Sequence, residues 1–134
     1  MRFFLDNCLP PRWAPALSAL IKEEGHSVIH LSEKFQRSEP DVQWLGKLAV
    51  DNQQTVVISG DERITRNPHE RLAWKESKLT AFFLASGWGH QKFWDKTWMF
   101  VRWFPTLIEQ SKIVAPGAGF VVPVHYGQNK LRSV

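Results

Sequence analysis

The feature that most constrains the fold of this chain is an alternation of short apolar runs with segments of helical spacing. The apolar runs cover residues 2–5, 26–31, 55–58, 79–84 and 119–124. The intervening helical segments cover residues 13–21, 38–49, 62–78 and 91–109. The runs are too apolar to leave one face in water, which is typical of parallel strands covered by helices on both sides. We therefore expect an α/β fold, a three-layer α/β/α sandwich with a mainly parallel sheet.

Three positions toward the C-terminus carry local expectations. Pro105 lies inside the aromatic segment 91–109 and is expected to kink or shorten that helix. Pro123 cannot donate a ladder hydrogen bond, so the last strand is expected at a sheet edge. Trp88 stands between two glycines and is expected to be exposed. Because the chain shows no linker, repeat or low-complexity segment, we expect a single domain over residues 1–134.

Composition narrows the compartment and the class of partner. Cys8 is the only cysteine, which excludes an internal disulfide and a cysteine-based zinc site and fits a reducing cytoplasm. An acid at position 6 interrupts the N-terminal apolar run, and no run approaches the roughly 18 residues of a membrane span. We expect a soluble, cytoplasmic protein. Its net charge of +4 is compatible with a polyanionic partner such as RNA or DNA.

Acidic side chains follow the predicted strands at one edge of the sheet. Asp6 follows the first strand, Asp61 follows the third, and Asp41 lies in the first turn of the helix after the second. Ligands of open parallel sheets bind beyond the carboxyl ends of the strands. Clustered carboxylates resist ionisation unless a cation neutralises them, and Mg²⁺ or Mn²⁺ prefers oxygen ligands. We therefore expect these acids to bind a metal ion that activates water for attack on a phosphate.

Each acid also has a purely structural interpretation. Asp6 before Asn7 is compatible with turn formation. Asp41 is the fourth residue of a capping box that would begin at Ser38. Asp61 after Gly60 could cap the next helix. These interpretations stay open beside the metal site.

Basic side chains cluster just after Asp61. Arg63 and Arg66 are the nearest, and we expect them to bind a substrate phosphate, because a guanidinium makes bidentate phosphate contacts. For Arg71 we expect a solvated helix face, and for His69 a turn or capping role. Cys8 is expected to be a small buried residue.

Three separated motifs resemble the PIN-like domain family, which includes the VapC-type toxin ribonucleases of toxin–antitoxin pairs. The first is the opening strand with Asp6, followed by Leu9-Pro10-Pro11. The second begins at Asp41, and the third runs from Val56 to Arg71. The motifs fall in the family's order and cover roughly residues 1–85. Residues 90–134, with the aromatic helix and the edge strand, carry no assigned motif.

The resemblance implies an α/β/α sandwich whose clustered acids bind Mg²⁺ or Mn²⁺ for RNA cleavage. Carried over by position, the catalytic and metal-binding residues are Asp6, Asp41 and Asp61, with Ser59 as the hydroxyl two residues before the third acid.

Many relatives carry a fourth acid shortly after the third, whereas here Arg63 stands two residues after Asp61. Glu62 or Glu70 could take that place.

We therefore predict an Mg²⁺-dependent endoribonuclease, the toxin of a type II toxin–antitoxin pair. Its expected partners are an RNA substrate, a cognate antitoxin and, as a further option, a second copy in a homodimer. The alternative is a PIN-like module that binds RNA or protein without cleavage. A haloacid-dehalogenase-like phosphatase is disfavoured, because such enzymes need a second Asp two residues after the first, where Cys8 stands.

Overall fold

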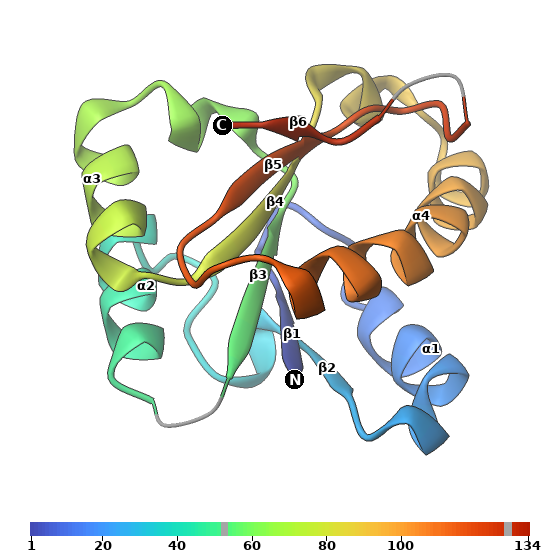
Figure 1. Cartoon of the computed structure of the whole chain (residues 1–134), viewed down its shortest axis with the longest axis horizontal. Helices are drawn as coiled ribbons and strands as arrows, with labels where there is room; N and C mark the ends of the chain where they lie inside the picture. The colour runs from blue at the N-terminus through green and yellow to red at the C-terminus, as the bar shows by residue number, and fades with distance from the viewer. Residues whose placement is uncertain (52–53, 128–129) are drawn as a thin grey trace.

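The centre of the molecule is a six-stranded sheet of order β2-β1-β3-β4-β5-β6 (Figure 1). It is seen in a computed structural model that describes residues 1–51, 54–127 and 130–134. The first five strands pair in parallel, and β6 pairs antiparallel with β5. The strands are β1 (Arg2–Leu5), β2 (Ser27–His30), β3 (Thr55–Ser59), β4 (Thr80–Leu84), β5 (Gly119–Val122) and β6 (Arg132–Ser133). The predicted, mainly parallel sheet is confirmed.

Helices cover both faces of the sheet, which confirms the predicted α/β/α sandwich. Helices α1 (Trp13–Leu20) and α4 (Phe93–Ile113) lie on one face, and α2 (Asp41–Ala49) and α3 (Pro68–Ser77) on the other (Figure 1). Shorter 3-10 turns connect them: η1 (Lys22–Glu24), η2 (Leu31–Glu33), η3 (Glu62–Thr65) and η4 (Ser86–His90). Within the described ranges, no helix is both long enough and apolar enough to cross a membrane.

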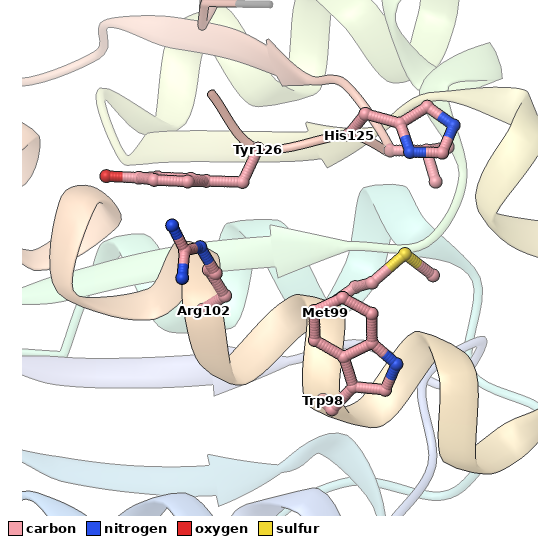
Figure 2. A pocket seen from close by; sticks show the side chains of 6 residues that line it. Trp98, Met99, Arg102, His125 and Tyr126 are labelled. Carbon is pink, nitrogen blue, oxygen red and sulfur yellow. The ribbon is translucent and has the colours of Figure 1, made fainter. Parts of the chain in front are cut away.

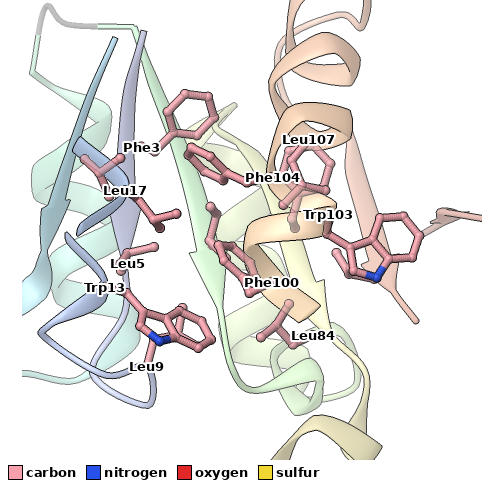
Figure 3. Packing of buried hydrophobic residues seen from close by; sticks show 14 of the residues in the cluster. Phe3, Leu5, Leu9, Trp13, Leu17, Leu84, Phe100, Trp103, Phe104 and Leu107 are labelled. Carbon is pink, nitrogen blue, oxygen red and sulfur yellow. The ribbon is translucent and has the colours of Figure 1, made fainter. Parts of the chain in front are cut away.

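The apolar strands supply a separate core to each face. Successive side chains of a strand point to opposite faces, so Phe3 and Leu5 of β1 enter the α1/α4 core while Phe4 enters the α2/α3 core. In the first core Phe3 packs edge-on against Phe104 with ring centroids 5.2 Å apart (Figure 3). In the second, Phe4 lies 5.2 Å from Trp44. Both cores are rich in Trp and Phe.

The start of α3 is set by local chemistry that the sequence announces. Pro68 is the first helical residue, and the Asn67 side chain accepts hydrogen bonds from the backbone N–H groups of His69 and Glu70, both at 3.1 Å. Further along, the Trp74 ring packs over Gly119 of β5, where an added Cβ would lie 2.3 Å from the indole. Gly119 therefore lets α3 approach the sheet closely.

The expectation that Trp88 is exposed is wrong, and so is the expectation that Pro105 shortens the aromatic helix. Trp88 is 3% exposed, because its Nε1 donates a 2.9 Å hydrogen bond to the Val122 carbonyl and draws the indole into the core. Helix α4 continues eight residues past Pro105 to Ile113 and is not shortened. Val101, whose carbonyl would bond position 105, lies with Pro105 on the exposed side, where water can satisfy that oxygen.

The last long strand is also not an edge. Pro123 falls one residue after β5 ends at Val122, so its missing N–H removes no ladder bond. The chain end folds back to form β6, and the Val134 N–H donates to the Gly119 carbonyl at 2.9 Å. A two-residue strand is too short to leave a periodic signal in the sequence.

Candidate functional site

Asp6 and Asp61 lie at the topological switch point of the sheet, between β1 and β3. From β1 the chain passes to β2 on one side and then to β3 on the other. The segment after β1 continues into α1 on one face, and the segment after β3 continues into α3 on the opposite face (Figure 1). Open α/β sheets bind ligands in the crevice that forms at such a point. Asp6 follows β1 and Asp61 follows β3, so both lie beside this crevice.

A hydroxyl joins the ends of β1 and β3. Ser59, the last residue of β3, donates a hydrogen bond from Oγ to the Asp6 carboxylate, and the same Oγ accepts from the Asp61 N–H at 3.1 Å. The Asp6 carboxylate also accepts from the N–H groups of Cys8 (3.0 Å) and Gly60 (3.2 Å). Asp6 therefore has a fixed orientation and makes the turn contact that its position before Asn7 suggested.

The close approach of these two loops depends on Gly60. A Cβ added there would lie 3.0 Å from the Cβ of Cys8 and 3.2 Å from a methyl of Leu9. A Cβ at this position would be in tight contact with these side-chain atoms, so Gly60 favours the close approach of the two loops. The spacing of Asp6 and Asp61 is thus built into the backbone.

Burial makes Asp6 reluctant to ionise. The residue is 3% exposed, and burial raises its pKa to about 6 from 3.8, although its three hydrogen bonds act in the opposite direction. The negative charge of Asp41 raises the pKa further. A nearby cation would relieve both costs, because it favours the ionised carboxylate.

Asp41 is held in place by a buried tryptophan. It is the first residue of α2, and its Oδ1 accepts a 2.9 Å hydrogen bond from Nε1 of Trp44, which packs on Phe4 of β1. Burial and the charge of Asp61 raise its pKa. The capping-box interpretation from Ser38 is wrong: Pro40 is the N-cap residue, and no side chain caps the helix. The i, i+3 spacing of Asp41 and Trp44 is compatible with this contact but does not by itself predict it.

Asp61 is paired with Arg63, which stands two residues after it. Arg63 donates from Nε and Nη2 to its two carboxylate oxygens at 2.9 and 3.0 Å, and from its backbone N–H at 2.9 Å. These hydrogen bonds hold the pKa of Asp61 below its usual value. The backbone bond also caps η3, so the structural interpretation of Asp61 applies beside any functional one.

The two candidates for a fourth acid point to different places. Glu70, in the first turn of α3, has its pKa raised by burial and by the charges of Asp41 and Asp61. Glu62 instead pairs with Arg66 at 3.5 Å and Arg132 at 3.9 Å. Of these two candidates, Glu70 is therefore the one whose pKa is affected by the charges of the other acids.

The remaining residues near the site have simple roles. Arg63 and Arg66 are paired with Asp61 and Glu62, but their side chains are 81% and 72% exposed and accessible to a ligand. Arg71 donates to the Thr65 carbonyl at 2.8 Å and supports the fold, which differs from the solvated face that we expected. Cys8 is exposed, whereas we expected it to be buried. Partial desolvation of its thiol, together with the charge of Asp6, raises the pKa of Cys8 to about 11.

The donor set suits a hard cation, but the carboxylates are satisfied by the protein itself. Asp6, Asp41, Asp61 and Glu70 offer only oxygen ligands, as Mg²⁺ and Mn²⁺ prefer. Among the described residues, no group of three or more His, Cys, Asp or Glu side chains is arranged to hold a metal ion. In addition, the Arg63 guanidinium occupies both oxygens of the Asp61 carboxylate. A metal ion bound through Asp61 would require this contact to open.

Comparison with known proteins assigns the chain to a family. A family model described as a PIN like domain matches residues 1–86, whereas the searches of curated proteins and of solved structures returned no match. The matched range includes all four acids and the two strands that carry Asp6 and Asp61. A domain of this kind indicates a nuclease or an RNA-binding module. Because the match covers well over half of the 134 residues, the chain belongs to the family of PIN-like domains.

Proposed function

We propose that this protein is a metal-dependent endoribonuclease that hydrolyses RNA phosphodiester bonds with Mg²⁺ or Mn²⁺ as cofactor. The observation that carries the proposal is electrostatic. At the switch point of the sheet, burial raises the pKa values of Asp6, Asp41 and Glu70, and the charges of neighbouring acids raise them further: Asp41 acts on Asp6, and Asp61 acts on Asp41 and Glu70. Folded proteins keep such repulsion mainly where function requires it.

Each residue of the site has a distinct proposed role. Asp6, Asp41, Asp61 and Glu70 would bind the ion, which would supply an activated water and stabilise charge on the phosphate. Ser59 would act as a positioning residue, because its hydroxyl orients Asp6 and holds the backbone of Asp61. Arg63 would exchange Asp61 for a phosphate oxygen of the substrate. Its guanidinium is 81% exposed, so this rotation meets little steric resistance.

A second candidate function, binding of RNA without cleavage, is favoured by the same Arg63 contact. The Arg63 guanidinium already neutralises the charge of Asp61. Asp61 therefore needs no metal ion to balance its charge. Titration with Mn²⁺ in a calorimeter separates the two functions. Heat of binding that disappears in Asp6→Asn supports the nuclease, and no measurable binding supports the module.

For the biological role we propose a cytoplasmic toxin of a type II toxin–antitoxin pair, held by a cognate antitoxin, with a homodimer as a further assembly. The support is the family membership together with apolar surface between α1 and α4, where Leu20 is 65% and Val101 38% exposed. A small neighbouring reading frame whose product copurifies with the chain and blocks RNA cleavage would support this role. A chain that cleaves RNA at the same rate with and without that product would contradict it.

The activity itself is tested by RNA cleavage. We expect purified protein to cut single-stranded RNA with Mg²⁺ and to stop when EDTA is added. Asp61→Asn should lower the rate by at least about a hundredfold, because a metal ion supplies several kcal/mol of charge stabilisation. The control is Asp95→Asn, an exposed acid in the first turn of α4. Equal rates in wild type and Asp61→Asn would refute the proposed site.

A further inference from the structure

A large groove lies at the carboxyl ends of β4 and β5 and reaches the loop after β3. Its volume is about 700 Å³, and it begins at Glu62, the residue after Asp61. Four side chains that can carry positive charge line it: Arg66, His125, Lys130 and Arg132. We refer to this cavity as the basic groove. His125, Lys130 and Arg132 come from the part of the chain beyond the matched residues 1–86.

The charge of the basic groove is positive and accessible. Of the residues that line it, one is acidic, and this Glu62 is paired with Arg66 at 3.5 Å and with Arg132 at 3.9 Å. The two arginine side chains are 72% and 70% exposed. The Glu62 side chain is 12% exposed, but both of its ion pairs are long and the arginine side chains reach solvent, so both guanidinium groups can turn to an incoming anion. The groove therefore suits a polyanion.

An aromatic pocket adjoins the groove. It has a volume of about 270 Å³ and lies between α4 and the segment after β5 (Figure 2). Trp98 and Tyr126 on its walls are 61% and 42% exposed, and Arg102 lies over the Tyr126 ring, 4.9 Å from its centroid. Exposed rings beside a guanidinium are the surfaces on which unpaired nucleobases stack.

The two cavities form one surface. Val124 and His125 line both the basic groove and the aromatic pocket. A strand that leaves the acids at Asp61 therefore meets Arg66 first, then His125 in the middle, and finally Trp98 and Tyr126. Cations that track a backbone and rings that take up bases are the two parts of a binding site for single-stranded nucleic acid.

We propose that the basic groove binds the phosphate backbone of single-stranded RNA and that Trp98 and Tyr126 stack on its bases. This inference rests on the proposed function, since it states that the RNA substrate of that site is single-stranded and where it binds. A duplex would not satisfy it, because its bases are stacked inside the helix and do not reach the rings. A protein partner would leave the cations without the regular row of anions that a polynucleotide offers.

The test measures binding without cleavage, so that it can fail independently of the proposed activity. With EDTA present, fluorescence anisotropy follows a labelled oligouridylate of about 12 nucleotides and an abasic strand of equal length and charge. Trp98→Ala should weaken binding of the oligouridylate about tenfold and leave binding of the abasic strand unchanged. Trp98→Phe, which keeps a ring, should restore most of the affinity. The matched control is Trp94→Ala, because Trp94 is 76% exposed on the same helix and does not line the pocket.

The backbone contacts are tested by salt dependence. Lys130→Ala should weaken both strands and lower the slope of log Kd against log salt by roughly 0.7, the value for one lost phosphate contact on a single strand. Lys112→Ala, at the other end of α4, should change neither. Equal affinity for oligouridylate and abasic strand, or a Trp98→Ala variant that loses a protein partner but keeps RNA, would overturn the proposal. RNA binding that survives while cleavage is absent would refute the proposed enzyme and keep this inference.

Discussion

The acids at the ends of β1 and β3 and the cations of the basic groove lie on the same edge of the sheet but are built in opposite ways. Asp6 is 3% exposed and receives three hydrogen bonds, whereas Arg66 and Arg132 are mostly exposed and share one distant carboxylate. Buried charges cost free energy and hold a fixed geometry. Exposed charges cost little and adapt to a partner. The fixed acids therefore suit a catalytic role, and the exposed cations of the basic groove suit transient binding of a substrate.

The largest expected effect tests whether the buried Asp6 carries a charge. The folded pKa of Asp6 is about 6 and its ordinary value is 3.8, so the unfolded chain releases this proton first as pH rises. The contribution of Asp6 to stability is therefore full below pH 3.8 and is lost between pH 3.8 and about 6, a loss of roughly 3 kcal/mol. In EDTA, Asp6→Asn should be more stable than wild type at pH 8 and lose this advantage at pH 4.

Urea unfolding at both pH values measures this difference. Asp95→Asn is the control, because Asp95 is exposed and its removal should leave the pH dependence unchanged. A free energy of unfolding that has the same pH dependence in wild type and Asp6→Asn would show that Asp6 carries no buried charge. The comparison between the two parts of the edge would then fail.

The next effect sharpens the boundary of the acid cluster. Glu70→Gln should lower the rate of RNA cleavage by about tenfold or more, because it removes one carboxylate from the proposed metal site. Glu76→Gln, on the same helix but exposed in its last turn, should leave the rate unchanged. Equal effects of the two substitutions would place Glu70 outside the site. If Glu62→Gln lowers the cleavage rate and Glu70→Gln does not, the fourth acid is Glu62, which lines the basic groove.

The smallest effect concerns Arg63, which lies between the two regions. Arg63→Ala should increase the affinity for Mn²⁺ several-fold, because the guanidinium no longer competes for both oxygens of Asp61. Calorimetric titration measures this change, and Arg12→Ala is the control, since Arg12 lies over the Phe93 ring instead. Weaker Mn²⁺ binding in Arg63→Ala would mean that the arginine supports the acids.

Much of the fold could be predicted because its signals are local. The β-branched run that ends at Ile58 forms a strand in any context that buries both faces, and Pro68 begins a helix where its missing N–H costs nothing. Trp88 was misjudged for the opposite reason. Its two glycine neighbours suggest a loop, yet the carbonyl that buries its indole belongs to Val122, 34 residues away.

The candidate site divides along the same line. Asp6, Asp41 and Asp61 could be placed at one edge because each follows directly from a strand end or a helix start. The choice of Glu70 over Glu62 could not, since it depends on how α3 docks against the sheet. The contact of Trp44 with Asp41 depends in turn on Phe4, against which Trp44 packs.

The sequence by itself determined the alternation of elements, the parallel sheet and the edge at which the acids lie, because hydrophobic periodicity and strand-end position act over a few residues. The tertiary structure alone decided which acids repel one another, that Arg63 closes on Asp61, and that the last residues return to line a groove that reaches the loop after β3. These features arise between segments far apart in the chain, where distance and burial set the strength of every charge.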